Sequence, residues 1–129
     1  MPRKPKKKTI KNKLRKLVHE IVKHRDGNIC QKCGQYCEGR NAHPSHVIPV
    51  SKSRLLQFDV TNIKVLCFRC HIMWWHKEPT DAGDWFKEKF PERWEYLDPK
   101  KELEDHRTVD DLIELHEAYL QLAKQIGIR

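Results

Sequence analysis

Two pairs of cysteines at the same short spacing constrain this chain more than any other feature. Cys30 and Cys33 form the first pair, and Cys67 and Cys70 form the second. Two thiolates that are separated by two residues reach the same side of a metal ion, so two such pairs complete the sulfur tetrahedron of a structural zinc site. We therefore predict a structural Zn²⁺ on these four residues, with the fifth cysteine, Cys37, as a weaker alternative ligand.

Length and composition explain why this chain would need a metal. Its 129 residues correspond to one compact domain with a small helical appendage, and only 38% of them are hydrophobic. The core is therefore modest, and zinc binding would add directly to the folding free energy. In a reducing compartment, five cysteines indicate metal ligands plus one spare thiol rather than disulfides.

The charge predicts a polyanionic partner. The net charge is +8 at pH 7, which favours nucleic acid; a generic basic protein is the less specific alternative. The chain has no apolar run of transmembrane length, and its basic start lacks the apolar region of a signal peptide. We therefore expect a cytoplasmic protein that does not contact membranes.

The chain is expected to open with a flexible basic arm, residues 1–16. This stretch contains nine Lys or Arg residues and no acid, and prolines interrupt its start. Lysines in such an arm displace counterions from phosphates and bind DNA without reading its sequence. The candidate phosphate-binding residues of the arm are Lys4, Lys6, Lys7 and Lys8. A solvated tail or a localisation signal is the alternative.

Apolar spacing predicts helices around the zinc unit. From Ile10 the apolar residues recur at helical intervals until Asp26-Gly27-Asn28, a turn sequence that leads into the first cysteine pair. We assign residues 10–79 to this helix plus the zinc-bound core, and residues 80–129 to a helical C-terminal extension. Thr108 is expected to start the final helix, which would serve packing or dimerisation.

The residues between and after the cysteine pairs predict a strand, a loop, a second strand and a helix. Two prolines exclude a helix from residues 42–50, which we expect to be extended. The second strand is the apolar run that follows Asn62, and residues 69–77 are expected to form the helix. This ββα order with zinc at its base predicts the α+β class.

Four residues of this unit are candidates for chemistry: His43, His46, Asn62 and His71. Phosphodiester hydrolysis needs an activated water, a cation on the phosphate and a fixed geometry between them. A neutral histidine is a suitable base near pH 7, because its ordinary pKa is about 6.5. We expect His46 to be the base, His43 and His71 to hold a divalent ion, and Asn62 to brace the loop that carries the base.

Several neighbouring residues have two interpretations. Lys52 and Arg54 would either contact phosphate or remain solvated. Trp74 and Trp75 would stack on unpaired bases or, as we favour, pack in the core of the helix. His76 would assist the metal or contact phosphate, or else pack beside its neighbouring tryptophan.

The order CxxC, HVIP, Asn and LCxxCH resembles the HNH, or ββα-metal, endonuclease family. The resemblance implies that His46 is the general base, that Asn62 lies between the two halves of the site, and that His71 binds a catalytic Mg²⁺ or Mn²⁺. Many members have an Asp or His directly before the base, where this chain has Ser45. The spacing His43-x-x-His46 is similar instead to that of phage junction-resolving endonucleases. His43 is therefore the preferred metal ligand, with Ser45 or water as the alternative.

A wider resemblance, to the lambda NinG (Rap) family of phage recombination nucleases, covers nearly the whole chain after the arm. It is carried by LRKLVHEIVKHRDGNICQKCG, by HPSHVIPVSKSRLLQFDVTNIKVLCFRCH and, less specifically, by the tail. That family often has Asn at the position of His71. The resemblance implies a structure-selective endonuclease, from a phage or prophage, that acts as a homodimer on branched recombination intermediates such as Holliday junctions. The alternatives are an HNH nickase or homing endonuclease on linear duplex DNA, and a zinc protein that binds DNA without cutting it.

Overall fold

The computed structural model describes residues 3–128, which form a small α+β fold around a two-stranded sheet. This confirms the predicted fold class. Short 3₁₀ turns and one π-helical segment, Arg69–Trp75, connect the regular elements. These elements are α1 (Lys7–Asp26), β1 (His43–His46), β2 (Ile63–Leu66), α2 (Pro79–Lys89), α3 (Pro91–Leu97) and α4 (Val109–Gln125). None of the helices in this range is long and apolar enough to cross a membrane.

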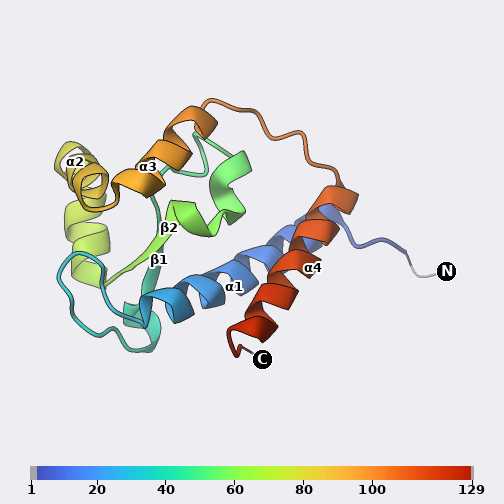
Figure 1. Cartoon of the computed structure of the whole chain (residues 1–129), viewed down its shortest axis with the longest axis horizontal. Coiled ribbons are helices and arrows are strands. Elements are labelled where there is room, and N and C mark those ends of the chain that lie inside the picture. The colour runs from blue at the N-terminus through green and yellow to red at the C-terminus, as the bar shows by residue number, and fades with distance from the viewer. Residues whose placement is uncertain (1–2, 129) are drawn as a thin grey trace.

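The β1–β2 hairpin occupies the middle of the molecule, with α1 and α4 on one side and α2 and α3 on the other (Figure 1). The two strands are antiparallel, and their register places His43 opposite Leu66 and His46 opposite Ile63. All four residues of β2 are buried. The hairpin therefore holds both candidate histidines of β1 against a rigid, buried strand.

Helix α1 buries the apolar stripe that its spacing predicts, namely Ile10, Leu14, Val18, Ile21 and Val22. The helix begins at Lys7, so the second part of residues 1–16 is helical and differs from the flexible arm that we expected. Residues 1 and 2 of that arm lie outside the described range. The helix ends in the predicted turn, where Gly27 and Asn28 both take positive φ, at 63° and 56°.

The end of α1 is fastened to the hairpin through backbone groups. Arg25 donates hydrogen bonds to the carbonyls of Val60 and Ile63 at 2.7 and 2.6 Å. The carboxylate of Asp26 accepts from the N–H of Val65 at 2.9 Å. Charge-assisted hydrogen bonds of this kind are stronger than neutral ones, so they fix the helix relative to β2.

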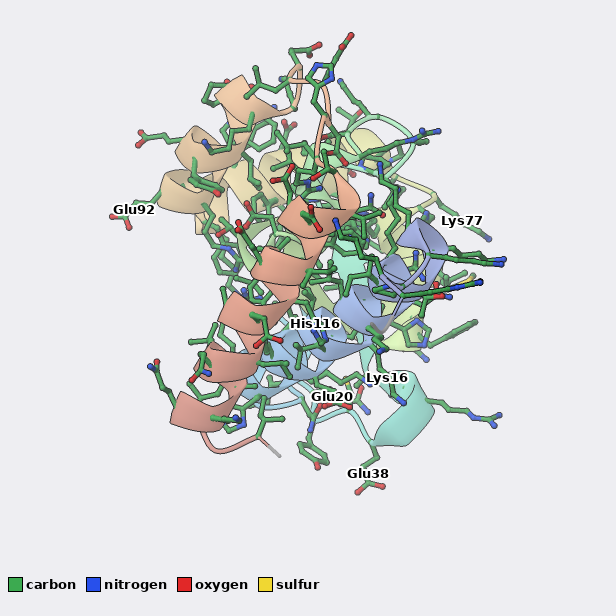
Figure 2. The ribbon with its side chains drawn as sticks, turned by 90° about the vertical axis from the view of Figure 1, so that its right-hand side faces the viewer. Lys16, Glu20, Glu38, Lys77, Glu92 and His116 are labelled. Carbon is green, nitrogen blue, oxygen red and sulfur yellow. The ribbon has the colours of Figure 1, made fainter. Side chains whose placement is uncertain are left out.

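Helix α4 packs along α1, which confirms the packing role expected for the terminal helix. Figure 2 shows His116 of α4 beside Lys16 and Glu20 of α1, and these residues share one surface hollow. As predicted, Thr108 starts α4: it forms a capping box with Asp111, in which each side chain accepts from the other residue's N–H.

A second, smaller apolar cluster joins the end of β1 to α2 and α3. Its buried members are Ile48, Leu56, Phe86 and Leu97, and tryptophans pack around them. Helix α2 begins at Pro79, because proline suits the first helical position, where no N–H is needed.

Candidate metal and catalytic centres

The four cysteines of the two pairs meet at one point. Their Sγ atoms lie within 4.8 Å of one another, and the Sγ atoms of Cys33 and Cys67 are 3.9 Å apart. Four sulfurs at about 2.3 Å from one tetrahedral ion are about 3.8 Å apart, so the cluster fits zinc. Cys37 is buried outside this cluster, and its thiol donates to the carbonyl of Gln35 at 3.5 Å.

Backbone N–H groups around the cluster favour the thiolate form of Cys30. Burial opposes ionisation of Cys30, but hydrogen bonds from backbone N–H groups outweigh it and lower the pKa of this thiol to about 7. Burial raises the pKa of Cys70, which a doubly charged ion would reverse on binding. Gly34 takes a positive φ, at 79°, which lets the chain turn tightly after the first pair.

His46 is the last residue of β1, and a backbone carbonyl determines which of its ring nitrogens carries the proton. Its Nε2 lies 3.0 Å from the carbonyl oxygen of Gln57, which can only accept a hydrogen bond. Nε2 therefore carries the proton and Nδ1 keeps its lone pair. Burial lowers the pKa of His46. The hydrogen bond to Gln57 acts in the opposite direction, and the charges of Lys64 and Arg15 lower the pKa further. The ring is thus neutral at pH 7, with Nδ1 able to accept a proton.

Asn62 is fully buried and braces the segment that follows His46. Its Oδ1 accepts from the N–H of Ile48 at 2.8 Å, and its Nδ2 donates to the carbonyls of Ile48 and Leu56 at 3.0 and 3.1 Å. The backbone carbonyl of Asn62 also accepts from the N–H of Val47 at 2.8 Å. These contacts connect the chain after β1 to the loop that carries Gln57, the partner of His46.

His43 is the first residue of β1, and His71 lies near the start of the π-helical segment; their rings face each other. Their Nδ1 atoms are 3.0 Å apart. Two ligands at about 2.1 Å from one ion, at adjacent octahedral positions, are also about 3.0 Å apart. Burial, and then the charges of His76 and His43, lower the pKa of His71 to about 4. His71 is therefore neutral near pH 7, and the separation of the two Nδ1 atoms fits two positions of a divalent ion.

His76, whose role the sequence left open, makes a specific contact with His71. Its Nε2 lies 3.0 Å from Nε2 of His71. Residues five apart are about 140° apart on an α-helix, but the π-helical segment closes an i→i+5 bond from the His76 N–H to the His71 carbonyl, at 3.1 Å. This wider turn places the two rings on one face, so that His76 can fix the tautomer of a metal-binding His71.

Lys64 is a buried group near the site that the sequence did not single out. It lies opposite Ser45 in the hairpin, and its Nζ donates to the Ser45 hydroxyl at 3.2 Å. The Nζ also lies 3.3 Å from the centre of the Trp75 ring, and burial lowers the Lys64 pKa well below its ordinary value. Ser45, the alternative metal ligand, is thus engaged with Lys64.

The candidate DNA-binding residues are exposed at the surface. Lys4 pairs with Asp110 of α4 at 3.0 Å. Lys6, Lys7 and Lys8 are exposed along the start of α1. Lys52 and Arg54 are exposed and line a shallow hollow together with acidic residues of the segment before α4.

The two tryptophans of the π-helical segment pack as we favoured. The ring centres of Trp74 and Trp75 are 6.1 Å apart, and Trp74 lies 5.3 Å from Trp85 of α2 in an edge-to-face contact. Both rings also contact the main core cluster.

Comparison with known proteins gives one result that matches this geometry. Residues 30–73, about a third of the chain, match the family model described as HNH endonuclease. The matched segment contains the cysteine cluster, both strands, Asn62 and the His43–His71 pair, consistent with an HNH ββα core. Searches of curated proteins and of solved structures found no match.

Proposed function

We propose that this protein is a metal-dependent DNA endonuclease of the HNH type, with His46 as its general base. The observation that carries the proposal is the state of His46. Its Nδ1 is left to accept a proton by the bond of Nε2 to Gln57, and it ends the strand that begins with His43 of the His43–His71 pair. The match of residues 30–73 to the HNH endonuclease family supports this reading.

The residues of the chain would divide the work of hydrolysis as follows. His46 accepts a proton from water at Nδ1 as the water attacks the phosphate in line. Asn62 keeps the base in position by holding the segment after β1 to the loop of Gln57. A Mg²⁺ or Mn²⁺ ion on His43 and His71, when bound, supplies positive charge for the phosphate and for the departing 3′-oxygen. Exposed Lys and Arg side chains hold the DNA backbone.

The proposed substrate is branched DNA, such as a Holliday junction, cut by a homodimer. The resemblance to phage recombination nucleases supports this choice, and the net charge of +8 suits a DNA partner. A two-fold dimer would place two equivalent sites on the two strands of a junction. Two alternatives are separated from branched-DNA cleavage by the test below. One is cleavage of linear duplex by a nickase or homing endonuclease, and the other is DNA binding without cleavage.

The test is cleavage of a labelled four-way junction and of a matched linear duplex, with Mg²⁺ or Mn²⁺. The proteins are wild type, His46→Ala and, as a matched control, His106→Ala, whose side chain is 82% exposed. We expect wild type and the control to cut the junction and His46→Ala to lose about 10²- to 10⁴-fold in rate while it still binds DNA. Equal cutting of both DNAs would remove the branch specificity. Binding without cutting by wild type, under either metal, would reject the nuclease.

A further inference from the structure

A cavity of about 320 Å³ opens beside the histidines. Two tryptophans, Trp75 and Trp94, form part of its wall, and Val47 adds an apolar surface. The cavity is also lined by His76, Gly83 and Lys87. A volume of this size is at the lower end for ligand pockets, so it suits one aromatic ring system rather than a large cofactor.

The position of the cavity connects it to the proposed chemistry. Val47 follows His46 directly in the chain, and His76 at the cavity is hydrogen-bonded to His71 of the His43–His71 pair. One wall, His76, is therefore one hydrogen bond away from a proposed metal ligand. A group in this cavity would thus lie beside the proposed metal site.

The charges around the cavity favour an occupant attached to phosphate. Lys87 is exposed at the cavity, with its Nζ 4.7 Å from the centre of the Trp94 ring. None of the described residues that line the cavity is acidic. Aromatic walls next to cations are the arrangement with which proteins hold unpaired bases of nucleic acids.

We propose that this cavity holds one unpaired nucleobase of the DNA, next to the phosphate that is cut. The inference rests on the proposed nuclease function and names the feature of the DNA that the site recognises. A base within a continuous duplex is stacked between its neighbours, so only a nucleotide that is unpaired or extruded can enter. The enzyme would therefore cut beside an unstacked nucleotide, and a fully paired duplex would leave the cavity without its occupant.

Gly83 offers a way to fill the cavity without deleting any group that lines it. Gly83 lies in α2, and outside its own helix no heavy atom lies within 4 Å of the position that a Cβ would take. A Gly83→Leu side chain would thus extend into open space. Glu88→Leu is the matched control, because it places the same side chain on an exposed position of the same helix.

The test uses a duplex with one unpaired 2-aminopurine, whose fluorescence falls on stacking, and the same duplex with an abasic residue at that position. Binding is measured with His46→Ala as the background, and cleavage is measured with the active proteins. We expect His46→Ala to quench 2-aminopurine and to bind the unpaired base about 5- to 150-fold more tightly than the abasic DNA. Adding Gly83→Leu should remove both effects, and adding Glu88→Leu should retain them.

The two readouts separate this inference from the function on which it rests. If Gly83→Leu retains the quenching and the preference, or if His46→Ala shows neither, the base pocket is rejected even when the DNA is cut. If no protein cuts any DNA, the nuclease is rejected, and the fluorescence still decides whether the cavity binds a base. A Trp94→Phe variant, which keeps an aromatic wall, should retain part of the preference.

Discussion

The four-cysteine cluster differs from the group formed by His43, His71 and His76, the histidine cluster, in how the ligand atoms are arranged. All four Sγ atoms of the cysteines fall within 4.8 Å of one another. The histidines instead form a chain of two contacts of 3.0 Å each, in which His71 is shared between His43 and His76. The first arrangement could surround one ion completely, whereas the second, in the proposed metal site, would provide two ligands and leave positions for water and phosphate.

This difference matches the distinction between structural and catalytic metal sites. Three of the four cysteines are buried, as expected for ligands that contribute to folding. The rings of His43 and His71 are only partly buried, so DNA can approach them. Loss of the cysteine cluster should therefore unfold the protein, whereas loss of the histidine cluster should leave a folded protein without activity.

The largest effect is expected from Cys67→Ser. A structural zinc contributes about 10–16 kcal/mol, which is at least comparable with the whole stability of a domain, about 5–15 kcal/mol. We expect the variant to lose zinc and the cooperative thermal transition together, as measured by metal analysis and circular dichroism. A zinc-free variant that melts like the wild type would show that the cluster does not support the fold.

The next effect, His71→Ala, should spare the fold. The variant removes one of the two facing Nδ1 atoms, so we expect cleavage to fall about 100-fold or more while zinc content and thermal stability stay near those of the wild type. His116→Ala, on α4, is the control for loss of a histidine. Coupled loss of zinc and cleavage in His71→Ala would mean that the two clusters are not independent.

A smaller effect is expected from pH. Burial lowers the pKa of His46 below 6.5, opposed by its bond to Gln57 and aided by Lys64 of β2 and Arg15 of α1; His19 of α1 also lies near this ring. The base works only when it is unprotonated, so cleavage should be full near pH 7 and fall about tenfold per unit below the lowered pKa. The acidic limb of the rate profile should have its midpoint below 6.5, and a midpoint above 6.5 would contradict the assignment.

The same shift affects stability with a definite sign. Because the folded chain binds this proton less readily than the unfolded chain, stability should decrease as the pH falls below 6.5. Thermal melting of His46→Ala should lose that part of the pH dependence.

The smallest effect is expected from Cys37→Ser. The thiol of Cys37 is buried but lies outside the four-cysteine cluster, and a hydroxyl can replace it as a donor to Gln35. We expect unchanged zinc content and a loss of about 1 kcal/mol in the free energy of unfolding. Loss of zinc in this variant would make Cys37 a ligand and would remove the distinction between the two pairs and the spare thiol.

The features that the sequence predicted are those that short-range spacing determines. The CxxC spacing predicted which four thiols come together, the apolar stripe predicted the buried face of α1, and Thr108 predicted the start of α4. The two helix features depend only on neighbouring residues and on the geometry of one turn or helix, and the union of the two cysteine pairs follows from the four ligands that one zinc ion needs.

The features that the sequence could not supply depend on distant or unusual geometry. The contact between His71 and His76 requires an i→i+5 helix, which a spacing of five does not predict. Lys64 lies in an apolar run, where a lysine would be expected to face solvent. It is buried because Ser45 on the opposite strand and Trp75 from a later segment surround its amine. The early start of α1 was missed because apolar spacing detects only residues that face the core.

The packing of α1 on α4 has a consequence for the order in which the molecule assembles. These helices come from opposite ends of the described chain; Lys4 and Asp110, which pair beside them, are 106 positions apart. Closing a loop of that length costs about 4 kcal/mol of chain entropy, whereas the hairpin closes a much shorter one. We therefore expect α4 to dock last and to detach first, which would uncover the part of the α1 apolar stripe that faces α4 while both clusters of ligands stay formed.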